Sequence, residues 1–340
     1  MAQTNKNNGC LWFFVLGLLS LFSFVILLAL FPISSNLALL ISIAGSVFFL
    51  SLILGKPSTK LLIRSGISIY LLLLALKFIA IFLLNSLNQS ETISFKKEEK
   101  TNKTIIIEEN DTTFLYSSNR DWIDNYGNNF NGTLSVRERD YNRLKNHINS
   151  YKAPINKYFW GSLYQYIEQK DAPSLDLVME TFIQINKDKK LNRMEFAEMV
   201  VSCIQDIPYS FVFQGECPVD NYDESTRAIL ERCPDCCIGN MAYGIQNPVS
   251  FLKNLKGDCD TRTVLIYSVL KHFKYDVAIV NSDFYRHSII GINLPASGDF
   301  KVFNGKKYVL WETTAKYYKV GELPVNFNNI THWNVVLTSK

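Results

Sequence analysis

The chain has 340 residues, of which 48% are hydrophobic and 19% are charged, and its formal net charge is +4. Residues 1–90 contain no Asp or Glu, so all 31 acidic residues follow this segment and the net positive charge arises within it. The length predicts two or three domains. Because the later residues carry no clustered Lys and Arg, nucleic acid is excluded as an expected partner.

Three apolar runs occupy most of the first 84 residues, at about 11–31, 36–54 and 65–84. Each has about 20 residues, which is enough for a helix to cross a hydrocarbon core of about 30 Å. A secretory signal is the competing interpretation of the first run, but a signal core is shorter and a small-residue cleavage site should follow it. We therefore predict a transmembrane region of three helices over residues 1–86, in contact with a lipid bilayer through residues 11–84.

The charges beside these runs predict their orientation. Lys56, Lys60 and Arg64 lie between the second and third runs, whereas FPISSN between the first and second carries no charge. Positively charged loops remain in the cytoplasm. The sequence thus predicts a multi-pass integral membrane protein with a cytoplasmic N-terminus and a C-terminal domain that is periplasmic or extracellular.

The remaining chain divides by composition into three parts. Residues 87–103 are polar and of mixed charge, which indicates a linker. Residues 104–154 alternate apolar and polar side chains around the turn-rich DNYGNNFNGT, which favours a small β-rich subdomain. Helical spacing begins near residue 155, and residues 155–340 are predicted to form the main domain, with a cysteine-rich insertion at 215–240. The piece INKDKKLNRMEF lacks the ligand pattern of a calcium loop and is interpreted as a solvated loop between two helices. Apart from the zinc alternative for the cysteines below, neither a metal nor a cofactor is predicted.

The stretch GDCDTRTVLIYSVLKHF places Cys259 where an apolar helical pattern begins. A helix N-terminus and a nearby imidazolium both favour the thiolate, which is the reactive form of cysteine. The flanking Asp258 and Asp260 would oppose ionisation if they faced the sulfur, but Asp is also a favoured helix cap. These features make Cys259 a candidate nucleophile.

A thiol nucleophile needs a base, and the chain has four histidines. His287 opens the strand-like run HSIIGINLP, so helix-to-sheet packing can bring it to the thiol, and His332 is its competitor. Glu312, at the end of the next run KYVLWETTA, is placed to orient the imidazole if these runs are antiparallel neighbours. We expect the terminal runs to form one antiparallel sheet against the helix of Cys259.

The order of GDC at a helix start, a histidine opening a strand, and an acid followed by threonine resembles the transglutaminase-like superfamily. The resemblance covers about residues 195–320 and includes VSCIQDIPYS, which is similar to the family's segment ahead of the nucleophile. It implies an α+β papain-like fold in which the nucleophile helix packs on an antiparallel sheet. It also implies that Cys259 is the nucleophile, His287 the general base and acid, Glu312 the orienting group and Gln205 an oxyanion donor. This sequence has glutamate where the family usually has aspartate, and Ile289 where the family has tryptophan.

The resemblance implies acyl transfer through a thioester on protein or peptide amides, by a membrane-anchored enzyme. Hydrolysis is favoured over cross-linking because water is the abundant acceptor. The alternative is a catalytically inactive binding or assembly module of the cell envelope, with an envelope protein as its partner. The Cys–His–acid set favours the enzyme.

Four cysteines gather in the insertion ahead of the nucleophile: Cys217, Cys233, Cys236 and Cys237. Two disulfides are predicted, and three pairings are open. A zinc site is the alternative, although adjacent Cys236 and Cys237 do not give the usual paired CxxC knuckles. A redox CPDC motif is disfavoured because no βαβ pattern accompanies it.

Overall fold

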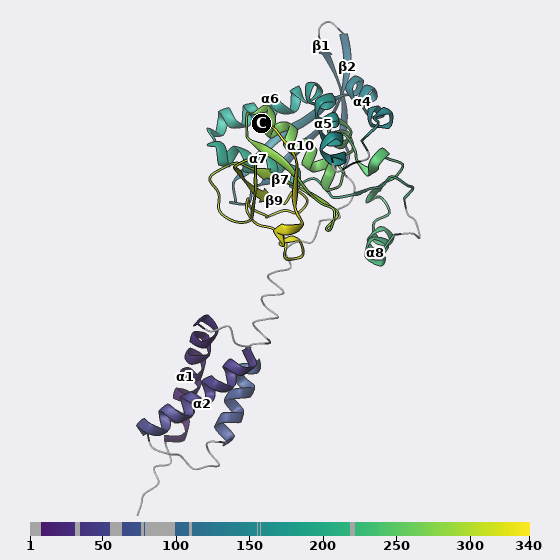
Figure 1. The fold of residues 1–340 in the computed structure, drawn as a ribbon. Coiled ribbons are helices and arrows are strands. Elements are labelled where there is room, and N and C mark those ends of the chain that lie inside the picture. Colours follow the sequence, from purple (N-terminus) through teal and green to yellow (C-terminus); the bar gives the residue numbers. More distant parts are fainter. Residues whose placement is uncertain are drawn as a thin grey trace, which may run out of the picture. The chain divides into compact units, whose positions relative to one another are not determined.

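The computed structural model describes residues 8–30, 35–54, 63–75, 78, 99–108, 111–154, 156, 158–217 and 222–340. The chain forms two compact units, Met1–Ser90 and Glu91–Lys340 (Figure 1). Residues 79–98, which include most of the predicted linker 87–103 and the end of the third apolar run, lie outside the described residues.

The first unit is helical. It contains α1 (Asn8–Leu30), α2 (Ser35–Leu54) and a further helical stretch at residues 63–75. The helices pack through a small apolar cluster: Trp12, Leu16, Leu39, Leu50, Ile69 and Leu73.

Within the described residues, no helix has both the length and the apolar character that crossing a membrane requires. This finding corrects the three predicted transmembrane helices and the membrane localisation with its periplasmic or extracellular domain.

The second unit begins with a three-stranded antiparallel sheet of β1 (Asn102–Glu108), β2 (Asp111–Ile123) and β3 (Asn129–Arg137), in that order. The tight turn between β2 and β3 falls in the Asn- and Gly-rich segment. Trp122 and Phe130 stack at 5.7 Å and join the core formed by the helices. These strands therefore share the main hydrophobic core of this unit.

Several helices follow the first sheet. They are α4 (Glu138–Leu144), α5 (Phe159–Asp171), α6 (Asp176–Lys189), α7 (Arg193–Gln205), α8 (Glu224–Arg232), α9 (Pro248–Asn254) and α10 (Cys259–His272), with short 3-10 turns at His147–Ser150, Ala172–Ser174, Ala242–Gly244, Val325–Phe327 and Ile330–His332. Two short strands, β4 (Phe211–Val212) and β5 (Cys237–Ile238), pair in parallel.

The second sheet is antiparallel and has the order β10-β6-β7-β9-β8. Its strands are β6 (Val277–Ser282), β7 (His287–Ile292), β8 (Phe300–Phe303), β9 (Lys306–Trp311) and β10 (Asn334–Thr338). Val277 and Ile279 belong to the core that contains α10, whereas Ala278 and Val280 pack with Trp333 on the other face. The alternation follows from the two-residue period of a strand.

Helix α10 packs on β6 and β7 and is flanked by α5 and α7 (Figure 1). The second unit is therefore an α+β fold with mainly antiparallel sheets. This architecture replaces the predicted fold class, which combined three transmembrane helices with a papain-like or transglutaminase-like domain. Its consequence for the site is that the first turn of α10 reaches the start of β7.

Candidate active site

Cys259 is the first residue of α10, and its side chain is 6% exposed. Asp258 is the N-cap, and its Oδ1 accepts a hydrogen bond from the backbone N–H of Thr261 at 3.1 Å. The preceding Gly257 is packed closely, since a Cβ there would lie 2.9 Å from the Phe251 ring. The thiol is thus held at a capped helix start by tight backbone packing.

His287 and Glu312 form a buried pair. The Nε2 of His287 lies 2.9 Å from Oε2 of Glu312, and neither side chain is more than 6% exposed. Ile290 of β7 pairs with Trp311 of β9, so Glu312 follows the strand at the position opposite Ile289. His287 is two residues before Ile289 and is therefore the diagonal neighbour of Glu312 on the same face of the sheet. Antiparallel pairing brings such diagonal side chains within reach of each other.

The second carboxylate oxygen of Glu312 is also occupied. Its Oε1 accepts hydrogen bonds from the backbone N–H groups of Thr313 and Thr314 at 2.8 and 2.7 Å, and from the Thr314 hydroxyl at 2.6 Å. Burial alone would raise the pKa of Glu312, but His287 and these donors outweigh it and lower the pKa to about 2. The carboxylate is therefore ionised and fixed.

The same pair determines the charge of the imidazole. Burial alone would lower the pKa of His287, but the Glu312 carboxylate opposes this and the net direction is a raised pKa. Because Glu312 occupies Nε2, Nδ1 is the ring nitrogen left to act as a base. The imidazole therefore has a fixed orientation and enough basicity to accept a proton.

The thiol lies at the start of β7. A hydrogen bond from the backbone of Ser288, the residue after His287, lowers the pKa of Cys259. Burial and the carboxylates of Asp260 and Asp258 outweigh it and raise that pKa well above its ordinary value. Among the contacts of the described residues, no hydrogen bond joins the Cys259 sulfur to the His287 ring. The thiol of Cys259 is therefore protonated in the resting protein.

Gln205 lies beside the backbone of Glu312. Its Nε2 donates to the backbone carbonyls of Glu312 at 2.7 Å and Tyr318 at 3.4 Å, and the side chain is 3% exposed. Both amide hydrogens are thereby used. In this arrangement Gln205 fixes the backbone of Glu312 and has no hydrogen left for an oxyanion.

Arg262 and Tyr209 contact the backbone just before Cys259. The sequence pattern did not single out either residue. Arg262 on α10 is fully buried and donates four hydrogen bonds of 2.6–3.1 Å to the carbonyls of Ile204, Ile207, Pro208 and Gly257. Tyr209 forms a parallel bridge with Gly257, and its ring lies 5.7 Å from the Arg262 guanidinium. An arginine at the i+3 position after a candidate nucleophile, on the buried helix face, was the available signal.

A buried polar network includes Asp260, the residue after Cys259, and Ser288, the residue after His287. Oδ1 of Asp260 accepts hydrogen bonds from the hydroxyls of Ser288 and, at 2.7 Å, Tyr164. Asn281 bonds to both Ser288, at 2.7 Å, and Tyr164, at 2.9 Å. The network joins α10, β7, β6 and α5.

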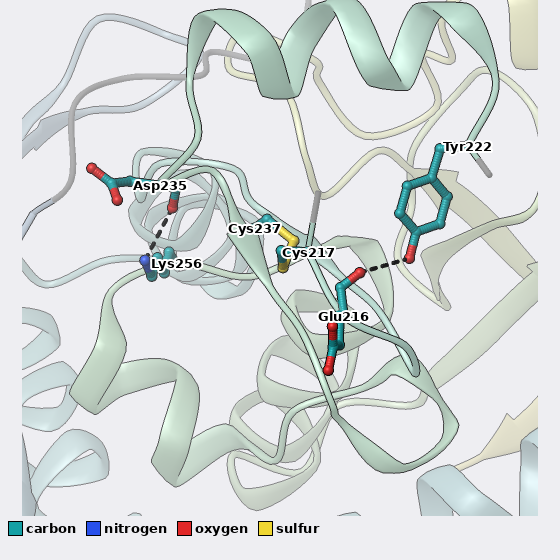
Figure 2. Close-up of a disulfide and its surroundings, with 6 residues drawn as sticks. All are labelled: Glu216, Cys217, Tyr222, Asp235, Cys237 and Lys256. Atoms are coloured by element: carbon teal, nitrogen blue, oxygen red, sulfur yellow. Dashed lines mark hydrogen bonds between the residues drawn. A yellow bond between two sulfur atoms is a disulfide. The ribbon is translucent and has the colours of Figure 1, made fainter. Parts of the chain in front are cut away.

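The cysteine-rich insertion contains two disulfides, Cys217–Cys237 and Cys233–Cys236. The first pairing is seen in Figure 2, close to the bond that Lys256 Nζ donates to the Asp235 carbonyl at 3.0 Å. Figure 2 also shows the Tyr222 hydroxyl, which donates to the Glu216 carbonyl at 3.5 Å. Of the cysteines whose side chains are described, Cys203 and Cys259 are free.

His332, the competitor of His287, lies in the aromatic cluster that also holds His287, whose ring stacks on Phe327 at 4.9 Å, but the acid Glu312 pairs with His287. The His332 ring stacks on Phe284 at 4.1 Å and contacts Tyr285. In the described part of the chain, no group of His, Cys, Asp and Glu side chains is arranged to hold a metal ion. The described contacts therefore join His287 to Glu312 and Gln205 to the backbone of Glu312, and the helix that begins at Cys259 packs on the strand that begins at His287.

No family model, curated protein or solved structure matches this chain.

Proposed function

We propose that this protein is a cysteine-dependent acyl-transfer enzyme that hydrolyses amide bonds in proteins or peptides, as the resemblance to the transglutaminase-like superfamily suggests. The observation that carries the proposal is the buried His287–Glu312 pair at the start of β7, the strand on which the helix that begins at Cys259 packs. A fixed acid, an oriented imidazole and a thiol at a helix N-terminus are the parts that nucleophilic catalysis requires.

The first step is proton transfer from the thiol of Cys259 to Nδ1 of His287. The raised pKa of the thiol keeps it protonated at rest, whereas Glu312 raises the pKa of the imidazole and stabilises the imidazolium that forms. Catalytic hydrogen bonds are often long in a free enzyme and shorten when substrate binds. The thiolate then attacks the amide carbonyl.

In the remaining steps, backbone N–H groups stabilise the oxyanion and the imidazole of His287 transfers protons. The free N–H groups in the first turn of a helix stabilise negative charge, which suits the tetrahedral oxyanion formed next to Cys259. The imidazolium of His287 gives its proton to the leaving amine, and a thioester remains on the sulfur. Water, deprotonated by His287, then releases the acid and restores the thiol.

Trapping the acyl-enzyme tests this proposal. The full chain would be mixed with an activated acyl ester and quenched in acid, and the adduct located by peptide mass mapping. We expect an acyl group on Cys259 in the wild type, much slower acylation in His287→Ala, and none in Cys259→Ser. Cys203 is a matched control, because burial raises its pKa to about 12 and it should remain unmodified. Equal acylation of wild type and His287→Ala would refute the assignment.

A catalytically inactive binding module is the second candidate, and the surroundings of the thiol favour it. Asp258 and Asp260 both raise the pKa of Cys259, and Gln205 has no amide hydrogen to offer an oxyanion. In such a module the buried polar groups would only stabilise the fold. The acylation experiment separates the two, since an inactive module gives no adduct on Cys259.

A further inference from the structure

The Cys233–Cys236 disulfide has the features of an exchangeable bond. It closes a loop with a sequence separation of 3, whereas Cys217–Cys237 has a separation of 20. A disulfide across a shorter loop removes less entropy from the unfolded chain and stabilises the fold less. The intervening Pro234 and Asp235 are exposed and Cys233 is half-buried, so a reagent can reach this side of the bond.

The same loop is tied to the nucleophile loop. The carbonyl of Asp235, between the two cysteines, accepts the hydrogen bond from Lys256, which lies three residues before Cys259 (Figure 2). On the other side, the carbonyl of Cys236 accepts from the backbone N–H of Phe211 at 2.9 Å. Tyr209, two residues before Phe211, bridges to Gly257. The CPDC loop thus contacts both backbone segments that enclose Cys259.

We propose that Cys233–Cys236 is a thiol–disulfide exchange site for a dithiol, and that its reduction loosens the Asp235–Lys256 contact and makes Cys259 more accessible. The disulfide holds the Asp235 carbonyl toward Lys256, and the thiol at the end of this short path is only 6% exposed. The inference uses Cys259 as a reporter thiol and does not depend on the proposed acyl transfer.

The exchange balances as a two-electron reduction of the protein. One thiolate of the dithiol attacks the sulfur of Cys233, which is more exposed than Cys236, whose residue is 3% exposed. A mixed disulfide forms, and Cys236 leaves as a thiolate and takes up a proton. The second thiol of the dithiol attacks the reagent sulfur that is bonded to Cys233. This step breaks the mixed disulfide and releases Cys233 as a thiol. The dithiol is oxidised to its cyclic disulfide.

The first experiment measures the order in which the two disulfides are reduced. The full chain would be exposed to increasing dithiothreitol, trapped with N-ethylmaleimide and mapped by peptide mass. We expect Cys233 and Cys236 to be trapped at lower dithiothreitol than Cys217 and Cys237. If Cys217 and Cys237 open first, or all four open together, the assignment of the exchange site is wrong.

The second experiment measures the coupling without a reductant present. Iodoacetamide labelling of Cys259 would be compared in wild type, Cys233→Ser/Cys236→Ser and Lys256→Met. Both variants should label Cys259 about fivefold faster than wild type, the factor that corresponds to one net hydrogen bond of about 1 kcal/mol. Combining them should add little, because both remove the same contact.

Two controls make the coupling refutable. Cys217→Ser/Cys237→Ser removes the other disulfide but leaves the CPDC loop closed, so Cys259 labelling should change less. Cys203 is fully buried and reports general unfolding. Unchanged labelling of Cys259 in Cys233→Ser/Cys236→Ser, or a parallel rise at Cys203, would overturn the proposed link.

Discussion

Asp260, the residue after Cys259 on α10, accepts a hydrogen bond from the hydroxyl of Ser288, the residue after His287 on β7. The element carrying the thiol and the element carrying the imidazole are thereby joined one residue away from both groups. Tyr164 donates to the same carboxylate oxygen at 2.7 Å, so the charge is shared by two buried hydroxyls. This bond fixes the approach of the helix to the strand, and it also places a negative charge close to the sulfur.

Asp260→Asn should make Cys259 more reactive toward alkylation. The Asp260 carboxylate raises the pKa of the thiol, and asparagine removes the charge while keeping an oxygen that can accept from Ser288. The pH midpoint of iodoacetamide labelling is therefore expected to move lower. Asp121→Asn, at an exposed position of β2, is the control. A midpoint that does not move, or that rises, would contradict this account of the site's electrostatics.

Glu312→Gln should destabilise the protein within a defined pH window. The folded pKa of Glu312 is about 2, below its ordinary 4.5, so its contribution is present above pH 4.5 and is lost as pH falls toward 2. The pKa of His287 is raised above its ordinary 6.5, so its contribution is full below pH 6.5 and is lost as pH rises through the folded value. The pair therefore stabilises the fold most between these limits, by on the order of 3 kcal/mol.

The measurement is urea unfolding of wild type and Glu312→Gln at pH 5.5 and at pH 8.5. The difference in unfolding free energy should be larger at pH 5.5. Glu180→Gln, an exposed change on α6, should show no such dependence. A difference that is the same at both pH values would mean that the His287–Glu312 pair does not carry charge in the folded state.

Gln205→Ala distinguishes a positioning residue from an oxyanion donor. In the structure both amide hydrogens hold backbone carbonyls of the loop after β9, so their loss should disturb Glu312 and shift the titration of His287. Stability should fall by about 1–3 kcal/mol, because a buried carbonyl loses its donor. The His287 titration would be followed by NMR. An oxyanion donor would instead slow acylation by about 10²–10³ with an unchanged His287 titration.

Arg262→Met should be among the most destabilising changes near the site. Arg262 donates to four carbonyl groups that converge around it. Methionine would remove these bonds, and only the carbonyls of Ile204 and Gly257 would keep a backbone donor among the described contacts. We expect a loss of about 3–5 kcal/mol in urea unfolding. Arg262→Lys keeps a charge and some donors and should lose less. Equal urea midpoints for wild type and Arg262→Met would show that water replaces the guanidinium without cost.

Local patterns were sufficient to locate several elements. Apolar spacing and the aspartate cap place the start of α10 at Cys259, and β-branched runs place β6, β7 and β9 in the chain. The same local reasoning was wrong about the N-terminal segment, where apolar length was taken as sufficient for membrane crossing. It also assigned Gln205 by its position in a motif, although its hydrogen bonds lie with residues more than a hundred positions away.

The sequence by itself determined which residues open a helix or a strand, because capping and side-chain periodicity act between residues close together in the chain. Only the tertiary structure decided that Ser288 donates a hydrogen bond to Asp260 and that Arg262 donates one to the Ile204 carbonyl near the end of α7. It also decided that Cys233 pairs with Cys236 and Cys217 with Cys237. Those contacts depend on how β7, β9 and α10 pack. Hydrophobic burial drives that packing without direction, and the hydrogen bonds that select one arrangement exist only once the elements are assembled.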